Sequence, residues 1–320
     1  MILLIVLSSL LPDSIKVALF GGSSIKSLRL KAGEKVFKIS ADMGSMYVNG
    51  VKMNSFRIEN PTFLEPDMGK YKGVVEFAYI DGGLRVINKV SLDDYLASVV
   101  ASESGDAPLE ALKAQAVLAR TFLVRWGLRH GYTHTCDSDH CQVYRGFDKV
   151  KPIHYEAVRE TEGEILSYEG KPVEVLFHAS CGGWVCEPKY IWKGGKNIPY
   201  FWTGEDPDCF KDEDEHYTWK IFVPLKTCPY VKRIPGTLRA YIMVLDGDTL
   251  YAYDFRKKFG LPSAVFAYWC TSSGVIFIGT GRGHGTGLCQ RGAMLKANRG
   301  WTYKEILEFY YKGASVVRVR

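Results

Sequence analysis

Residues 91–126 read SLDDYLASVVASESGDAPLEALKAQAVLARTFLVRW and predict two consecutive helices. Ser91 and Asp94 have the Ser-x-x-acid spacing of a capping box, which marks the start of the first helix. Apolar residues then recur at helical spacing, at Leu92, Tyr95, Leu96, Val99 and Val100. Pro108 suits the first turn of a second helix, which is apolar on nearly every side as far as Trp126. We therefore expect the second helix to be buried at the centre of the fold.

Short runs of alternating apolar and polar residues lie on both sides of these helices and predict strands. From residue 15 to 90 the runs are separated by turn residues such as Asn49-Gly50, which tolerate the positive φ of a hairpin turn. Strand patterns return at 164–177 and between 238 and 278. The sequence therefore predicts an α+β fold, in which a β-rich N-terminal lobe packs on a mixed α/β core around a buried helix.

Size and charge limit the class of protein. The chain has 320 residues, of which 47% are hydrophobic, and this is ample for a buried core. We expect one region over 15–313, with the β-rich lobe at 15–90 and the mixed core at 91–313. The net charge of +6 comes from scattered Lys and Arg rather than from a basic stripe, which argues against a nucleic-acid partner.

The first eleven residues are almost wholly apolar and are followed by Pro12. As a helix they would span about 16 Å, roughly half of the hydrocarbon core of a bilayer, so they cannot cross a membrane alone. They fit the apolar part of a secretory signal, although no Lys or Arg precedes them. A buried first strand is the alternative interpretation of residues 1–11.

Glu103 is the candidate catalytic residue. It lies eleven positions after Leu92, so it continues the apolar face of the first helix at the end of that helix. Partial desolvation and the negative pole of the helix dipole both favour a protonated carboxyl there. A protonated carboxyl near neutral pH is what a general acid requires. By geometry alone, an ordinary surface glutamate at a helix end is the alternative.

A loop rich in His and Cys follows the second helix and is the candidate metal site. Two imidazoles and two thiolates fall within eight positions and suit a tetrahedral zinc ion, at His134, Cys136, His140 and Cys141. With four protein ligands the zinc would be structural and would brace the loop beside the glutamate. A disulfide between Cys136 and Cys141, with two incidental histidines, is the alternative.

Four further cysteines allow two disulfides. Cys181 can pair with Cys186 across a short loop, and Cys209 can pair with Cys228. Spacing alone does not decide either pairing.

Four motifs occur in order along the chain. The helical stretch contains PLEALKAQA at 108–116, CQVY follows at 141–144 and FHASCGG at 177–183. The segment GRGHGTGLCQRGA at 281–293 completes the set. Together the motifs resemble the stage II sporulation protein D family, and the resemblance runs from about residue 15 to 313.

The resemblance implies a lytic transglycosylase that cleaves peptidoglycan glycan strands between N-acetylmuramic acid and N-acetylglucosamine. It implies an elongated substrate cleft, no organic cofactor and a location outside the cytoplasm, either secreted or membrane-associated at the cell wall. Glu103 occupies the position of the family's catalytic acid. One carboxyl can protonate the glycosidic oxygen and then accept the proton of the muramyl 6-hydroxyl, which closes a 1,6-anhydro ring. No second carboxylate is required, unlike in most glycoside hydrolases.

Other features of the family leave alternatives open. Some relatives carry zinc at a comparable His/Cys cluster, and others lack it. Relatives described as amidase enhancers share these motifs, so a non-catalytic cell-wall-binding protein with a cell-wall amidase as partner is the second interpretation. Cys289 stands where a small polar residue is common in the family, which allows a redox or metal link there.

The remaining candidate residues are assigned by position. Arg120, in the buried helix, can orient Glu103 or hold a carboxylate of the substrate, or it can form an ion pair with Glu110. Residues that match the motifs are expected to contact the sugar, namely Lys113, Gln115, Gln142, Tyr144, Ser180 and His284. For His284 a loop histidine bonded to the main chain is the alternative.

Overall fold

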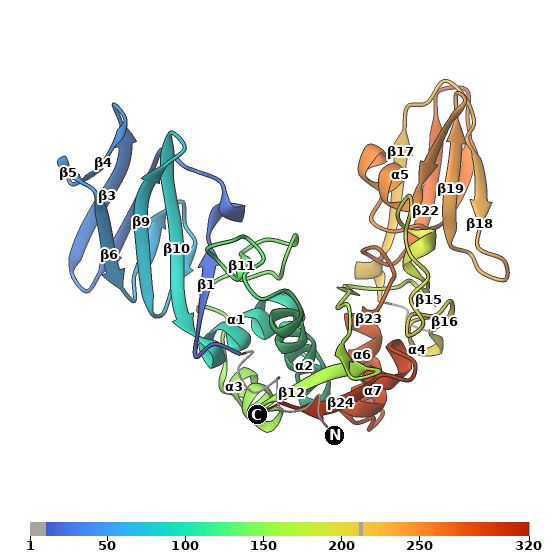
Figure 1. Ribbon diagram of the computed structural model, residues 1–320. Coiled ribbons are helices and arrows are strands. Elements are labelled where there is room, and N and C mark those ends of the chain that lie inside the picture. The colour runs from blue at the N-terminus through green and yellow to red at the C-terminus, as the bar shows by residue number, and fades with distance from the viewer. Residues whose placement is uncertain (1–10, 211–213, 320) are drawn as a thin grey trace. The chain divides into compact units, whose positions relative to one another are not determined.

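The computed structural model describes residues 11–210 and 214–319, and the chain forms two compact units (Figure 1). The first unit comprises residues 1–174 and 316–320, and the second comprises 175–315. The mixture of helices and strands confirms the predicted α+β class. The predicted leader at 1–11 lies outside the described residues except for Leu11. Among the described helices, none is both long and apolar enough to cross a membrane.

Two sheets, one antiparallel and one mixed, form the β-rich part of the first unit. The six-stranded sheet has the order β5-β4-β3-β2-β7-β8, with β2 (Ser27–Ala32), β3 (Lys35–Asp42), β4 (Ser45–Val48), β5 (Val51–Met53), β7 (Thr62–Glu65) and β8 (Gly69–Lys70). Asn49 and Gly50 both have positive φ and join β4 to β5 in the predicted two-residue hairpin.

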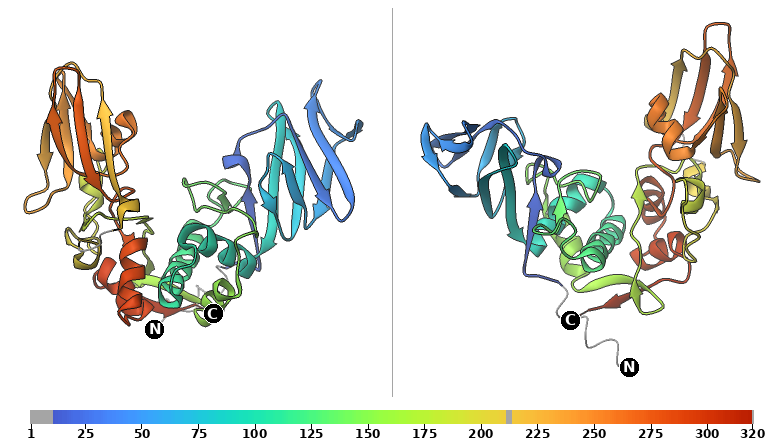
Figure 2. Two further views of the ribbon diagram at one scale, coloured as in Figure 1. Left: turned by 180° about the vertical axis from the view of Figure 1, so that it is seen from behind. Right: turned by 45° about the horizontal axis from the view of Figure 1, so that its top comes forward.

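The second sheet leads into the helices. Its order is β11-β1-β10-β9-β6, with β1 (Ser14–Ala18), β6 (Ser55–Glu59), β9 (Val74–Ile80), β10 (Gly83–Ser91) and β11 (Thr135–Cys136). All pairs in it are antiparallel except β1 with β11, which run parallel. Strand β10 ends at the residue that caps the first helix, so the sheet and the helix are continuous. Figure 2 shows the helices of this unit gathered at one end of the sheet.

The helices of the first unit confirm the predictions for residues 91–126. Helix α1 spans Leu92–Ser104, and the hydroxyl of Ser91 accepts the N–H of Asp94 at 3.1 Å. Helix α2 spans Leu109–Trp126, and every side chain from 111 to 124 is buried except Lys113. Helix α1, α3 (Pro152–Glu160) and β12 (Glu164–Tyr168) pack against α2. Helix α2 is therefore the central buried helix of this unit.

A strand from the end of the chain completes the first unit. Strand β24 (Ser315–Arg318) pairs with β12 in the three-stranded order β13-β12-β24, where β13 is Lys171–Pro172. The two units do not divide at residue 90, where the β-rich lobe was expected to end: β1 to β10 belong with α1 to α3, and the second unit begins only after β13. The reason is that β10 runs directly into α1, whereas β24 returns to the first unit.

The second unit contains two small antiparallel sheets and two short strand pairs. The sheets are β17 (Thr218–Val223), β22 (Val275–Thr280) and β21 (Val265–Cys270), and β18 (Tyr230–Arg233), β19 (Ala240–Leu245) and β20 (Asp248–Tyr251). The pairs are β14 (Phe177–His178) with β23 (Leu288–Cys289), which is parallel, and β15 (Trp184–Val185) with β16 (Gly204–Glu205). A core that includes Met243, Phe255, Phe266 and Phe277 joins the two sheets to α5 (Ala252–Phe259).

Three further helices lie at the other end of the second unit. They are α4 (Pro207–Phe210), α6 (Gln290–Asn298) and α7 (Tyr303–Tyr310). Figure 2 shows the red helices α6 and α7 at the end opposite the orange strands. Thr302 and Glu305 form the capping box that begins α7. Short 3₁₀ turns complete the elements, η2 (Phe20–Gly22), η3 (Pro188–Tyr190) and η4 (Glu215–Tyr217).

Both predicted disulfides of the second unit are wrong. Cys228 pairs with Cys270, with 5.7 Å between their Cα atoms. Cys228 precedes β18 and Cys270 ends β21, so the bond links the two small sheets. Cys209 lies instead beside Cys289, with 3.5 Å between the sulfurs. Cys186 lies near the hydroxyl of Thr286 rather than near Cys181.

Candidate functional site

Glu103 lies in the last turn of α1 and is half-buried. The helix ends one residue later, because Gly105 adopts a positive φ of 54° and donates its N–H to the carbonyl of Ala101. Oε1 of Glu103 accepts the main-chain N–H of Val143 at 2.7 Å. The carboxyl is therefore oriented by the loop between α2 and α3 as well as by its own helix.

The segment around Val143 is fixed to α1 by several bonds. Gln142 is fully buried, and its Oε1 accepts the hydroxyl proton of Tyr95 at 2.9 Å. Ser102 accepts the N–H of Arg145, and Ser98 donates to the carbonyl of Gly146 at 2.6 Å. These bonds hold the loop in register with the helix that carries Glu103.

Two predicted sugar contacts lie within this support. Tyr144 is buried, stacks on Tyr95 and donates its hydroxyl to Oδ1 of Asn88 at 2.6 Å. Tyr144 therefore links the loop to β10 through a buried hydrogen bond. Gln142 retains an Nε2 with no acceptor in the part of the chain that the structure describes. A role of Gln142 in binding a sugar stays a prediction.

The polar residues of α2 are engaged within the protein. Gln115 is buried, and its Oε1 accepts from the hydroxyl of Ser104 at 3.4 Å, so Gln115 reaches the end of α1 beside Glu103. Lys113 forms ion pairs with Glu110 and Glu160, both at 2.6 Å. Lys113 thereby joins α2 to α3.

Arg120 braces the fold through main-chain carbonyls. Its guanidinium is buried and donates to the main-chain carbonyls of Glu164 at 3.0 Å and Val158 at 3.2 Å. Burial lowers the pKa of Arg120 to about 10, which leaves it charged at neutral pH. It lies five residues beyond Gln115, or about 7.5 Å further along the helix axis. Its bonds therefore tie α2 to α3 and β12, and they are not the predicted pairing with Glu103 or Glu110.

Four soft donors of the same loop lie together and could hold a metal ion. One ligand atom each from His130, Cys136, His140 and Cys141 lies within 4.8 Å of the others. Nε2 of His130 is 3.1 Å from Sγ of Cys141, and Nδ1 of His140 is 3.5 Å from Sγ of Cys141 and 3.8 Å from Sγ of Cys136. Bonds of 2.0 to 2.3 Å give a tetrahedron with edges of roughly 3.3 to 3.8 Å, so the donor set fits zinc. Cys136 and Cys141 are thiols, so the alternative disulfide is not formed.

His134, one of the predicted ligands, lies outside this group of four donors. Its ring Nδ1 accepts the main-chain N–H of Lys16 at 3.0 Å, and the main-chain N–H of His134 donates to the carbonyl of Lys16. The ring is thus engaged with β1, outside the cluster. His130 replaces it, because the turn after α2 brings this residue back towards Cys141. The only signal in the sequence was a further histidine four positions upstream.

The remaining predicted residues belong to the second unit. Ser180 is buried, and its hydroxyl accepts the N–H of Gly182 at 3.4 Å and lies 3.7 Å from Sγ of Cys209. Nδ1 of His284 accepts the N–H of Thr286 at 3.1 Å, as the alternative of a loop histidine bonded to the main chain predicted. Burial and the nearby Arg256 lower the pKa of His284 to about 3, so this imidazole is neutral at physiological pH.

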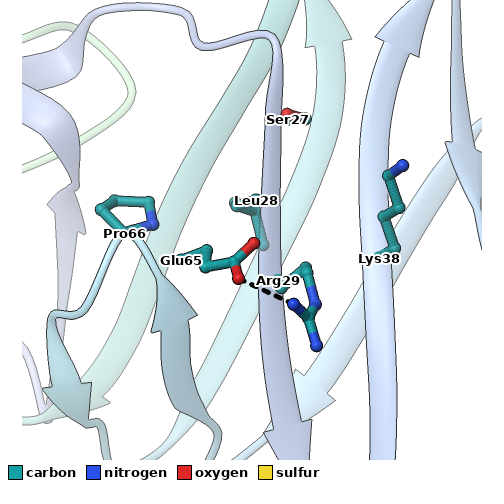
Figure 3. Close-up of a pocket in the computed structure, with 6 residues that line it drawn as sticks. All are labelled: Ser27, Leu28, Arg29, Lys38, Glu65 and Pro66. Carbon is teal, nitrogen blue, oxygen red and sulfur yellow. Dashed lines mark hydrogen bonds and ion pairs between the residues drawn. The ribbon is translucent and has the colours of Figure 1, made fainter.

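An open hollow of about 650 Å³ lies elsewhere, on the six-stranded sheet (Figure 3). Arg29 donates to Glu65 across it at 2.7 Å. Its other lining residues are Ser27, Leu28, Lys38 and Pro66. None of the predicted site residues lines this hollow. Its carboxyl, that of Glu65, is exposed and paired with Arg29, whereas the carboxyl of Glu103 is half-buried.

Comparison with known proteins shows the family of the chain. The sequence profile of the family described as Stage II sporulation protein matches residues 80–168, which include Glu103 and the four soft donors. Stage II sporulation protein D of Bacillus subtilis is 31% identical over 261 residues, covering 72% of this chain and 75% of the relative. The chain belongs to the stage II sporulation protein D family.

Two other relatives extend the comparison. An uncharacterised protein of Brachyspira hyodysenteriae is 31% identical over 268 residues, covering 78% of this chain and 72% of the relative. The amidase enhancer of Bacillus subtilis is 22% identical over 279 residues, covering 65% of this chain and 38% of the relative.

The placement of Arg120 predicts a loss of stability when its side chain is replaced. Arg120→Met removes the buried guanidinium that donates to the carbonyls of Glu164 and Val158, so the free energy of unfolding should fall by about 2–4 kcal/mol. Arg125→Met, on the exposed side of the same helix, should cost about 1 kcal/mol or less. Urea unfolding measures both. Equal losses for the two variants would contradict the bracing role.

Proposed function

We propose that this protein is a peptidoglycan lytic transglycosylase that cleaves glycan strands between N-acetylmuramic acid and N-acetylglucosamine, with Glu103 as general acid and then general base. The observation that carries the proposal is the half-buried carboxyl of Glu103, oriented by the N–H of Val143 within the segment that matches the family. The family membership supports a cell-wall protein of the sporulation type, acting outside the cytoplasm.

The proposed chemistry needs one carboxyl. Oε1 accepts the N–H of Val143, and we assign the acidic proton to Oε2. Oε2 gives this proton to the glycosidic oxygen as the bond from that oxygen to the muramyl C1 breaks. The carboxylate then accepts the proton of the muramyl 6-hydroxyl, while the oxygen of that hydroxyl bonds to C1. The product carries a 1,6-anhydro ring, no water is consumed, and Glu103 returns to its protonated form.

We also propose that zinc binds His130, Cys136, His140 and Cys141 and has a structural role. Four protein ligands complete a tetrahedral site, so the ion serves to fix the loop. Cys141 lies two residues before Val143, which orients Glu103. The metal cluster would thus brace the support of the proposed acid.

A second function follows from the relative named as an amidase enhancer. In that alternative the chain binds cell-wall glycan without cleaving it and acts through a cell-wall amidase. The two functions differ in whether new ends of glycan strands appear when the protein acts without an amidase.

The transglycosylase proposal predicts the products of glycan incubated with purified protein. Mass spectrometry should find anhydro-muramyl ends with the wild type, and Glu103→Gln should lower their rate of formation by at least about 100-fold. Glu59→Gln, an exposed change on β6, is the matched control and should retain full activity. Strands with and without stem peptides should both be tested.

Two outcomes would contradict this proposal. Equal product formation by the wild type and by Glu103→Gln would remove Glu103 from the chemistry. Binding of strands that stay intact with every variant would favour the amidase-enhancer alternative.

The corrected ligand set predicts which histidine is needed for zinc. His130→Ala should lose one equivalent of zinc relative to the wild type, because one corner of the tetrahedron is removed. His134→Ala should keep the wild-type content, since this ring bonds to the main chain of β1. Plasma mass spectrometry of the purified variants measures the content. A loss in His134→Ala alone, or in neither variant, would refute the assignment.

A further inference from the structure

We propose that the second unit contains a separate metal site, in which the thiolates of Cys181, Cys209 and Cys289 and the carboxylate of Asp206 bind zinc. This site is distinct in sequence from the cluster of the first unit. The proposal does not depend on the transglycosylase activity.

The four donors converge from three segments of the chain. One ligand atom from each residue lies within 4.8 Å of the others, and all four residues are buried. Sγ of Cys209 is 3.5 Å from Sγ of Cys289, and Sγ of Cys181 is 3.7 Å from Oδ2 of Asp206. These separations match the edges of a tetrahedron built on bonds of 2.0 to 2.3 Å.

The fold brings these segments together for identifiable reasons. His178 pairs with Cys289 in the parallel register of β14 and β23, which places the turn after β14 beside the start of α6. Gly183 adopts a φ of 90°, and its carbonyl accepts the N–H of Asp206 at 2.9 Å. Asp206 directly precedes α4, which contains Cys209 and contacts α6. The four donors therefore come from three separately anchored segments, with Asp206 and Cys209 on the same one.

Main-chain donors point at one of the sulfurs. Sγ of Cys289 accepts the N–H of Cys181 and the N–H of Gly292, both at 3.2 Å. Cys289 is the N-cap of α6, where the helix dipole stabilises negative charge. A Cβ at position 292 would lie 2.1 Å from the hydroxyl of Tyr310 and 2.3 Å from Oδ2 of Asp206. Only glycine allows this close approach between α6 and the cluster.

The carboxylate of Asp206 is held by two donors, and one of them is a cation, Lys296, which also pairs with Asp208 at 2.8 Å. Lys296 is fully buried, and its ammonium donates to Oδ1 of Asp206 at 2.6 Å, while Tyr310 donates to Oδ2 at 2.6 Å. Three thiolates and a carboxylate exceed the charge of a divalent ion, and the ammonium of Lys296 offsets part of the excess. Such bonds to a ligating carboxylate are typical of metal sites and fix its orientation.

The donor chemistry selects the ion. Three thiolates favour zinc over magnesium or calcium, which prefer oxygen ligands. Oxidation of Cys209 and Cys289 to a disulfide is the competing outcome, since their sulfurs are close. A disulfide would leave the third thiol and the convergent carboxylate without a common function.

The test measures metal in the full chain purified under reducing conditions. Cys209→Ser and Cys289→Ser should each lose one equivalent of zinc relative to the wild type, whereas Cys186→Ser should lose none. Cys186 is the matched control, because it is a buried thiol of the same unit outside the cluster. His130→Ala should lose a different equivalent, so the losses of His130→Ala and Cys289→Ser should add.

A second measurement keeps all four donors of the second-unit cluster. Its result therefore does not depend on whether Cys209→Ser and Cys289→Ser fold. Cobalt added to the double variant Cys136→Ser, Cys141→Ser, which keeps no thiolate in the first cluster, should give intense thiolate-to-cobalt charge-transfer absorption. Zinc contents of Cys209→Ser and Cys289→Ser equal to that of the wild type would overturn the proposal. So would the absence of this absorption, or a second disulfide found by intact mass in freshly purified protein.

Discussion

Helix α2 is enclosed by protein along most of its length, and this constraint organises the first unit. Each polar side chain on the helix must find its partner inside the fold. Arg120 meets this requirement through the carbonyls of Val158 and Glu164, and Lys113 through two glutamates. Gln115 does so through Ser104 at the end of α1. The bonds that satisfy α2 therefore also position α1 and α3 around it, and with them the end of α1.

The orientation of Glu103 depends on this arrangement from two sides. Its helix is fixed by α2, and its carboxyl is fixed by Val143 in the loop that follows α2. The loop is held in turn by Tyr144, which bonds to β10. The four soft donors also converge in this loop, and one of them, Cys141, directly precedes Gln142. A general acid works only when its proton is directed at the leaving oxygen. In the proposed function, the buried contacts and the zinc site supply that direction.

Local patterns predicted much of the fold, whereas contacts between distant segments could not be predicted. The capping box at Ser91 and the Asn49-Gly50 turn depend on neighbouring residues, and both were confirmed. Glu103 could be selected because motif order and helical spacing agreed. His130 was missed because the path of a loop decides which histidine reaches the thiols. The partner of Cys228 was missed because two sheets that are distant in sequence bring it close.

The most direct test of the central claim is a crystal structure of Glu103→Gln bound to a short glycan fragment that contains the bond between N-acetylmuramic acid and N-acetylglucosamine. The account predicts that the glycosidic oxygen lies about 3 Å from the side-chain amide at position 103. The muramyl 6-hydroxyl should lie within reach of the same group. A fragment bound at the hollow on the six-stranded sheet, with no sugar at position 103, would contradict the assignment of Glu103 as the catalytic acid.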